Sequence, residues 1–474
     1  MRRDAKPRPG SRTFSGKSPY LVRSVVPGIE WPGLPDQMDA SVLAIEYQLR
    51  RSLWWPTSRL AEQQRRQRDL LVGHAARTVP FYRERLAVVA GAGAQTISDD
   101  QTISDELWRR IPIVTRADLR NAGSTLESRK ALPSHGRRFE IRSSGTTGRP
   151  VTVQGTALTT IMSRALNLRD HLWHKRDMRA TAALIRRLDD KVDEGGDKAA
   201  RWAFGADSGP LISYDIARPV KNQVAWLRTQ EPAYLMTHPS NLRAIIDACR
   251  EGTKDLPSLR EVDTFGEPVD DSLRAETKQV LGVPLVDSYS AEETGPLALQ
   301  CPDCECYLVQ SEAVQVEVVD DAGEPSRYGD TGRVVVTALH NYATPLVRYE
   351  IGDCAEPAAP CDCGRGLPRL RAIPGRVRNM MILPSGDKIR PPFAIGSLTR
   401  MFALEQAQFV QTAIDRLEAL LVAPRAWTAE EEEAFRREIC QRLGQDFAIE
   451  LKFVAEIPFP PSRKFEEFRC EIEA

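Results

Sequence analysis

The strongest constraint on the fold of this chain is an alternation of helical and short apolar segments between about residues 155 and 285. Residues 159–173 carry apolar side chains at helical spacing. Residues 233–240 have the pattern of a strand that ends in a turn, and a helical pattern follows at 242–250. Strands that alternate with helices form a sheet covered by helices. The sequence therefore predicts an α/β fold, whose ligands are expected at the carboxyl ends of strands.

The length and charge of the chain indicate a globular protein with more than one domain. A chain of 474 residues with 42% hydrophobic residues is expected to be globular and to contain two or more domains. The 65 basic and 65 acidic residues balance, so composition indicates no nucleic-acid partner. The sequence has no apolar run of the ~18 residues typical of a membrane span, and its basic start leads into no apolar segment typical of a secretory signal. We therefore expect a cytoplasmic protein without membrane or nucleic-acid partners, and a homodimer is left open.

Residues 143–150 form a loop rich in hydroxyl groups and glycine, Ser-Ser-Gly-Thr-Thr-Gly-Arg-Pro. The patterns at 139–142 and 151–153 predict a strand on each side of it. Glycine lets the backbone approach a ligand, and backbone N–H groups and hydroxyls can donate to phosphoryl oxygens. The loop is not a Walker motif, which ends in Gly-Lys-Ser/Thr at the start of a helix. The pattern predicts a phosphate-binding hairpin, with an ordinary turn as the alternative.

Five of the nine cysteines fall into two clusters, Cys301, Cys304 and Cys306, and then Cys361 and Cys363. In a chain without an export signal this pattern favours a metal over disulfides. Four thiolates suit a tetrahedral zinc ion and leave no open position, so a structural zinc is expected. One of the five cysteines is not needed as a ligand, and the choice between Cys304 and Cys306 stays open. A zinc ribbon that binds nucleic acid is the alternative, although no basic run flanks the clusters.

The loop resembles the phosphate-binding motif of the adenylate-forming enzymes, which include acyl-CoA ligases and adenylation domains, at seven of eight positions. Further segments resemble other motifs of that family, or the entry region of its phenylacetate-CoA ligase and coenzyme F390 synthetase-like branch. They are 74–86, 111–119, 264–268, 287–295, 345–353, 375–382 and 457–465. The resemblance implies a large N-terminal layered α/β domain and a small mobile α+β lid.

The resemblance also implies roles for individual residues. The residues that would bind ATP or AMP are Ser143, Ser144, Gly145, Thr146, Thr147, Gly148, Arg149, Gly266, Glu267, Pro268, Asp287, Ser288, Tyr289, Ser290, Glu292, Asp353 and Arg376. Among these, Tyr289 would stack on adenine and Asp353 would bind the ribose hydroxyls. The catalytic residues would be Lys464, Glu293 and Thr147, with Glu293 holding Mg²⁺. The substrate pocket would contain Trp173, His238, Ser240 and Phe265. The aromatic rings among these residues favour an aryl or arylalkyl acid as the substrate.

Four positions depart from the family pattern. Arg149 stands in the usual lysine place, and Ser290 replaces a glycine. Glu292 replaces the usual Ser or Thr. A carboxylate repels a phosphate unless a cation intervenes, so Glu292 either contacts the metal or turns away. Arg378 occupies the hinge position, where aspartate or lysine is usual.

The expected division is a loose leader at 1–36, an ATP- and acid-binding domain at 37–375 that carries the zinc loops, and a lid at 376–474. The resemblance implies that ATP activates a carboxylic acid as an acyl-adenylate, with release of pyrophosphate. The acyl group would then pass to a thiol of CoA or a carrier protein, or to an amine. An AMP transferase of the coenzyme F390 synthetase type and a catalytically silent homologue are the alternatives. The expected cofactors are ATP, Mg²⁺ and structural Zn²⁺.

Overall fold

The computed structural model describes residues 22–89, 102–130, 132–142, 151–188, 197–251, 256–386, 388–393, 395–457 and 467–472. Its α-helices are α1 Gln37–Ser52, α2 Thr57–Thr78, α3 Tyr82–Arg85, α4 Asp105–Arg109, α5 Arg116–Ala122, α6 Ala157–Trp173, α7 Val220–Gln230, α8 Pro239–Glu251, α9 Asp271–Leu281, α10 Ile395–Met401 and α11 Ala429–Leu443. Its strands are β1 Arg138–Arg142, β2 Thr152–Thr156, β3 Ala182–Arg186, β4 Asp197–Ala199, β5 Leu211–Asp215, β6 Tyr234–Thr237, β7 Glu261–Phe265, β8 Leu285–Ala291, β9 Gly295–Gln300, β10 Tyr307–Val309, β11 Val314–Val319, β12 Gly332–Ala338, β13 Tyr349–Ala358, β14 Arg369–Arg376, β15 Met381–Ile382, β16 Lys388–Ile389, β17 Gln406–Ala413, β18 Arg416–Val422, β19 Ala448–Phe453 and β20 Phe468–Cys470.

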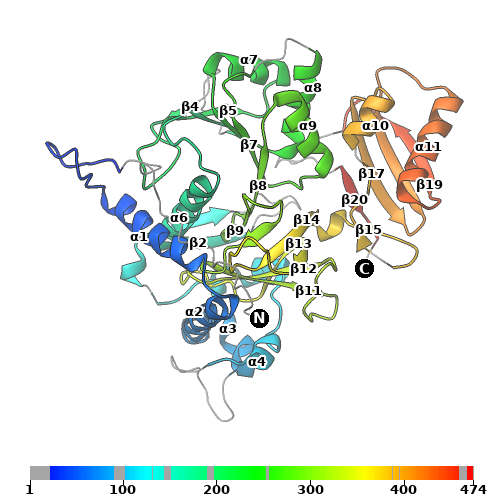
Figure 1. Cartoon of the computed structure of the whole chain (residues 1–474). Helices are drawn as coiled ribbons and strands as arrows, with labels where there is room; N and C mark the ends of the chain where they lie inside the picture. Colours follow the sequence, from blue (N-terminus) through cyan, green and yellow to red (C-terminus); the bar gives the residue numbers. More distant parts are fainter. Residues whose placement is uncertain are drawn as a thin grey trace, which may run out of the picture.

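The strands from β3 to β14 form one large sheet, in the order β11-β12-β13-β14-β10-β9-β8-β7-β6-β3-β5-β4. Strands β5, β3, β6, β7 and β8 are parallel neighbours. Parallel strands need crossover connections, and α7, α8 and α9 supply them (Figure 1). These helices share one hydrophobic core with the parallel strands, which includes Ile185, Leu242 and Val262. The predicted α/β fold is therefore confirmed.

The antiparallel half of the sheet, from β9 to β14, has a core of its own. Leu71 and Val72 of α2 pack there with Val334 and Val336 of β12. Two long helices, α1 and α2, are separated by Pro56, because proline interrupts a helix. The predicted strands around the phosphate loop are confirmed, since β1 pairs antiparallel with β2. The loop itself, 143–150, lies outside the described residues.

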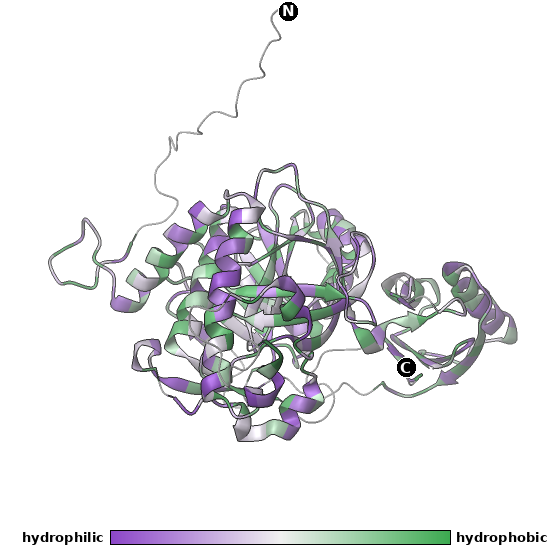
Figure 2. Cartoon of the chain, turned by 90° about the horizontal axis from the view of Figure 1, so that it is seen from below, coloured by the Kyte–Doolittle hydropathy of each residue, from purple (hydrophilic) through white to green (hydrophobic). Residues whose placement is uncertain are grey.

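The C-terminal part builds a separate sheet in the order β19-β18-β17-β20, and α11 packs against it (Figures 1 and 2). Phe409, Leu417 and Phe435 belong to its core and are fully buried. Residues Ala429–Leu443 form α11. A capping box at Thr428 starts this helix, and Gly444 ends it at a φ of 69°. Strand β20 was not predicted, because three residues carry too little pattern.

Ion pairs join the C-terminal part to the rest of the chain. Arg400 of α10 reaches Asp247 of α8 at 3.4 Å and Glu276 of α9 at 2.9 Å. Arg390 lies 3.9 Å from Asp270, which precedes α9. The C-terminal sheet therefore lies beside the helices that follow β6 and β7.

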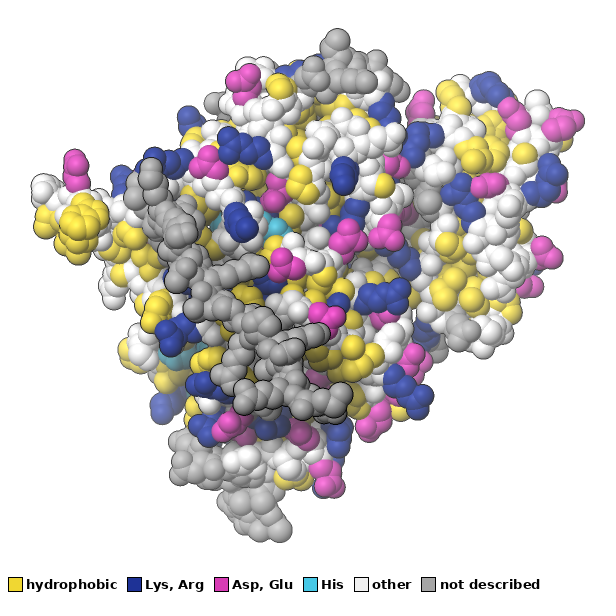
Figure 3. Space-filling model, viewed as in Figure 1, with side chains coloured by type: hydrophobic (Ala, Val, Ile, Leu, Met, Phe, Trp, Pro, Cys, Tyr) yellow, Lys and Arg dark blue, Asp and Glu magenta, His cyan; other side chains and the backbone are white. Residues whose placement is uncertain are grey.

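The segment before α1 projects from the body of the molecule (Figures 1 and 3). Its exposed apolar side chains include Val25, Ile29, Trp31 and Leu34, and Trp31 is 87% exposed. Asp36 ends the segment and caps α1 by accepting a hydrogen bond from the Asp39 N–H at 2.8 Å. In the part of the chain that the structure describes, no helix has the length and apolarity to cross a bilayer.

Candidate functional site

The candidate site begins where the parallel strands β6, β7 and β8 end. The register aligns Thr237 with Thr264 and Phe265 with Ser288, so the residues after these strands meet at one edge of the sheet. The ring of His238 lies 4.7 Å from that of Phe265, and its Nδ1 lies 2.9 Å from the Phe265 carbonyl oxygen. The structure thus places two of the predicted pocket residues in contact.

The turn after β7 carries the predicted Gly-Glu-Pro segment. The Glu267 carboxylate accepts a hydrogen bond from the Ser240 N–H at 2.9 Å, which ties the turn to the start of α8. Gly266 has a φ of 78°, a conformation that favours glycine. A Cβ on Gly375 would lie 2.7 Å from Pro268 Cγ, so the end of β14 lies directly against this turn.

Three predicted nucleotide-binding residues from different motifs form one hydrogen-bonded group. The Tyr289 hydroxyl donates to Asp353 Oδ2 at 2.9 Å, and Arg376 Nε lies 3.0 Å from Asp353 Oδ1. The register of β13 with β14 pairs Asp353 with Arg376. Burial and the Asp353 charge raise the pKa of Tyr289, so its hydroxyl stays a donor. Each oxygen of Asp353 has a further lone pair, with which it could accept from two hydroxyl groups of a ligand.

Glu293 and Glu292, adjacent in the sequence, have opposite environments. Glu293 is buried, and its Oε1 accepts no hydrogen bond from the described residues. Arg116 Nη2 lies 4.0 Å from that oxygen. Glu292 is exposed, as is Ser290. The structure therefore turns Glu292 toward solvent and leaves Glu293 as the carboxylate that faces the other predicted residues.

Two residues that the sequence placed in the site make contacts that support the fold. Asp287 is buried and accepts hydrogen bonds from the Thr264 hydroxyl at 2.7 Å and the Tyr307 hydroxyl at 2.6 Å. Both carboxylate oxygens thus hold β7, β8 and β10 together. Trp173, the last residue of α6, packs with Leu308 among the cysteine loops. We therefore assign structural roles to Asp287 and Trp173.

The cysteine clusters lie together, but they do not form a metal site in this structure. The Sγ atoms of Cys304 and Cys361 are 3.7 Å apart. Cys306 instead accepts from Arg369 Nη2 at 2.7 Å. Within the described ranges, no group of three or more His, Cys, Asp or Glu side chains is arranged to hold a metal ion. The expected zinc is therefore not supported by the structure.

The remaining predicted residues cannot be placed. Ser143, Ser144, Gly145, Thr146, Thr147, Gly148, Arg149 and Lys464 lie outside the described residues. The backbone of Arg378 lies in a short 3₁₀ helix, Val377–Asn379, and its side chain is not described.

The sequence reasoning missed two residues beside Glu293. In the sequence, Arg116 belongs only to the segment 111–119 and Tyr349 only to the segment that contains Asp353. Burial raises the pKa of Tyr349, and the Glu293 charge raises it further while the Arg116 charge lowers it. These three groups therefore lie close together, which no spacing in the sequence indicates.

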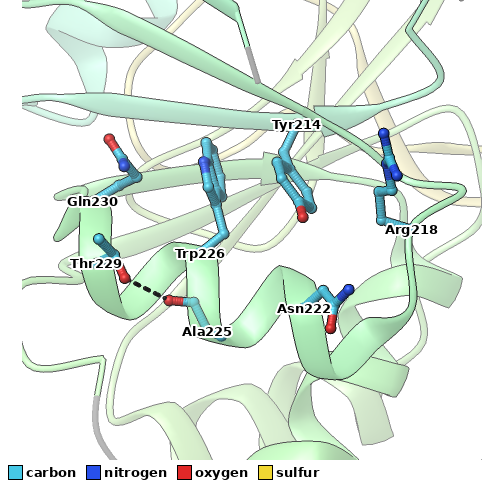
Figure 4. A pocket seen from close by; sticks show the side chains of 7 residues that line it. All are labelled: Tyr214, Arg218, Asn222, Ala225, Trp226, Thr229 and Gln230. Carbon is cyan, nitrogen blue, oxygen red and sulfur yellow. Dashed lines mark hydrogen bonds between the residues drawn. The ribbon is translucent and has the colours of Figure 1, made fainter. Parts of the chain in front are cut away.

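A pocket elsewhere on the molecule is unrelated to this group. It lies between β5 and α7, where Tyr214 and Trp226 stack with ring centroids 4.8 Å apart (Figure 4). Arg218 and Asn222 also line it, and none of the predicted site residues does.

Comparison with known proteins agrees with the fold. Phenylacetate-coenzyme A ligase of Pseudomonas putida is 28% identical over 328 residues, which cover 65% of this chain and 69% of the relative. The enzyme of the same name from Thermus thermophilus is 26% identical over 352 residues, covering 69% of this chain and 73% of the relative. A family model described as the CapK C-terminal domain matches residues 382–468.

Solved structures show the same architecture. A 2-hydroxyisobutyryl-CoA ligase in the postadenylation state superposes with a TM-score of 0.67 at 21% identity, over 89% of this chain and 91% of the other. An anthranilate CoA ligase in complex with anthranoyl-AMP superposes with a TM-score of 0.50 at 16% identity, over 69% and 64%. The chain is thus similar in sequence to phenylacetate-CoA ligases, shares its overall fold with solved CoA ligases, and matches the CapK C-terminal domain over residues 382–468.

Proposed function

We propose that this protein is an ATP-dependent ligase that activates a carboxylic acid as an acyl-adenylate and passes the acyl group to CoA. The observation that carries the proposal is the group of Tyr289, Asp353 and Arg376 at the edge of the sheet, with Glu293 nearby. An aromatic ring, a carboxylate with free lone pairs and a guanidinium suit an adenosine nucleotide. The names of the curated relatives support CoA as the acceptor.

The reaction needs alignment and charge cancellation rather than covalent help from the protein. A carboxylate oxygen attacks the α-phosphorus, and the bond from that phosphorus to the bridging oxygen breaks. The electron pair leaves with pyrophosphate. Asp353 and Tyr289 would hold the nucleoside while this exchange occurs.

Mg²⁺ suits the environment of Glu293. A buried carboxylate oxygen that accepts no hydrogen bond from the described chain is a hard oxygen donor, the kind that Mg²⁺ prefers. When bound, the ion would supply positive charge next to the leaving pyrophosphate. Glu293 would hold it in place.

The aromatic rings at the strand ends bear on the class of acid. We propose an aryl or arylalkyl acid, because the rings of His238 and Phe265 offer an apolar face at the strand ends. Residues 376–474 would act as a lid that turns about Arg378 between the two half-reactions.

A panel of carboxylic acids that includes phenylacetate tests this function. With ATP and Mg²⁺, at least one acid should release pyrophosphate, and CoA should then yield a thioester that mass analysis identifies. An AMP ester of a hydroxyl compound as the product would instead indicate a nucleotidyl transferase. Nucleotide binding without pyrophosphate release from any acid would indicate a silent homologue.

Structural zinc remains a proposal for the cysteine loops. Two thiolates on one tetrahedral zinc ion, with Zn–S bonds of about 2.3 Å, lie about 3.8 Å apart. The Cys304 to Cys361 separation of 3.7 Å is compatible with that geometry, and the Cys304 thiol also contacts Cys301. We propose Cys301, Cys304, Cys361 and Cys363 as ligands, with Cys306 as the spare thiol, which accepts a hydrogen bond from Arg369.

Cys361→Ser should lower the zinc content of the purified protein to well under one equivalent and reduce its thermal stability, because a structural metal contributes folding energy. Cys306→Ser is the matched control and should retain the metal. Wild-type protein purified without metal and free of zinc would show that the loops fold as reduced thiols.

A further inference from the structure

Arg116 lies beside Glu293, although the two residues are far apart in the sequence. The segment before α5 joins the sheet, because Val114 forms a parallel bridge with Tyr349 of β13. The Val114 N–H donates to the Arg348 carbonyl oxygen at 2.8 Å. Pairing with β13 therefore carries Arg116 to the edge of the sheet where the candidate nucleotide residues gather.

The start of α5 is held in one orientation. The Thr115 hydroxyl accepts from the Asp118 N–H, and the Asp118 carboxylate accepts from the Thr115 N–H, so both halves of a capping box are present. Arg85 also donates to Asp118 at 2.8 Å. Because the helix start is fixed at both ends of the box, the direction in which Arg116 leaves the backbone is fixed as well.

Buried polar atoms next to Arg116 lack partners in the described chain. Glu293 Oε1 and the Tyr349 hydroxyl are buried and make no hydrogen bond there. The 4.0 Å between Arg116 Nη2 and Glu293 Oε1 is longer than a hydrogen bond. Since buried polar groups are nearly always paired, a polar ligand is expected between these side chains.

The two guanidinium groups near Glu293 have different tasks. Arg376 is bonded to Asp353 at 3.0 Å and donates to the Ile351 carbonyl oxygen at 3.0 Å, so it is committed to the nucleoside end of the group. The Arg116 side chain is 18% exposed, and it extends toward Glu293 from the start of α5. Arg116 is therefore the guanidinium group that lies beside the Glu293 carboxylate.

We propose that Arg116 binds the pyrophosphate part of ATP and stabilises it as the leaving group. The inference rests on the proposed ligase function and assigns the anion-binding end of the same site. A planar guanidinium donates to two phosphate oxygens at once. As the bond from the α-phosphorus to the bridging oxygen breaks, negative charge accumulates on pyrophosphate, and Arg116 donates to it while remaining protonated. The Tyr349 hydroxyl, which makes no hydrogen bond within the described chain, would be a second donor to the same anion.

Arg116→Gln tests the proposal with two anions. We expect the Kd for magnesium pyrophosphate and the KM for ATP to rise about 10–100-fold, the size of one lost charged hydrogen-bonding contact. The Kd for AMP should stay unchanged, because AMP lacks the β- and γ-phosphates. Arg116→Lys should restore part of the affinity. Arg120→Gln, at an exposed position one turn further along α5, is the matched control and should leave all three constants unchanged.

Titration calorimetry with magnesium pyrophosphate needs no acid, so the inference and the ligase function can fail separately. Equal losses for pyrophosphate and AMP would mean that Arg116 supports the whole site, and the proposal would be wrong. A change only in the Mg²⁺ dependence would mean that Arg116 acts through Glu293, which also overturns it. Wild-type protein that binds no pyrophosphate overturns it too. The wild-type protein could also bind magnesium pyrophosphate, lose that affinity in Arg116→Gln, and yet release pyrophosphate with none of the acids. That outcome would contradict the ligase function but not the role of Arg116.

Discussion

Glu293→Gln is expected to abolish acid-dependent pyrophosphate release, with a loss of at least about 10²–10³ in kcat/KM. The amide keeps the size of the side chain but removes the charge that would hold Mg²⁺. Pyrophosphate would then leave without its main counter-charge. The fold should survive, because Glu293 Oε1 accepts no hydrogen bond from the described chain and its ion pair with Arg116 spans 4.0 Å.

Glu292→Gln is the matched control for this experiment. Its carboxylate is exposed, so the same chemical change one residue earlier should leave activity close to that of the wild type. Steady-state pyrophosphate release over a range of Mg²⁺ concentrations, with circular dichroism to check the fold, makes the comparison. If Glu293→Gln remained active at saturating Mg²⁺ and Glu292→Gln did not, the two assignments would have to be exchanged.

Lys464→Ala is expected to slow formation of the acyl-adenylate by about 10²–10³, the size of one lost charge-stabilising donor. The resemblance to the adenylate-forming family places this lysine at the carboxylate and the α-phosphate only while the adenylate forms. Transfer of a preformed acyl-adenylate to CoA should be much less affected. Single-turnover measurements of the two half-reactions make the comparison.

Lys452→Ala serves as the control in the same part of the chain. Lys452 lies on β19, is 40% exposed and pairs with Glu418 at 2.8 Å, so its removal should change neither half-reaction. Equal slowing of both steps by Lys464→Ala would mean that this lysine supports the fold or the nucleotide site in general. If neither step slowed, Arg463 would be the next candidate.

Local patterns predicted several of the elements correctly. Apolar spacing predicted α6 and α8, and the alternation of strands with helices predicted the α/β sheet. Strand β20 was not readable, because it is ordered by pairing with β17 rather than by its own three residues.

Which side chains meet was decided by pairing between distant strands. Asp287 lies in a motif that suggested ligand binding, yet the register with β7 sets it opposite Thr264, and Tyr307 of β10 takes its second oxygen. Trp173 ends a correctly predicted helix, but the direction of that helix carries the ring to the cysteine loops. Sequence spacing holds no information on either contact, because both depend on strands that are far apart in the chain.

The sequence alone determined the class of fold, the order of the motifs and the family that this chain resembles, because those features are carried by local pattern and residue type. The tertiary structure decided that Tyr289, Asp353 and Arg376 form one hydrogen-bonded group and that Glu293 rather than Glu292 faces inward. It also brought Arg116 to Glu293 through the bridge between Val114 and β13. A charged group acquires its role from the charges around it, and those neighbours become adjacent only when the sheet has formed.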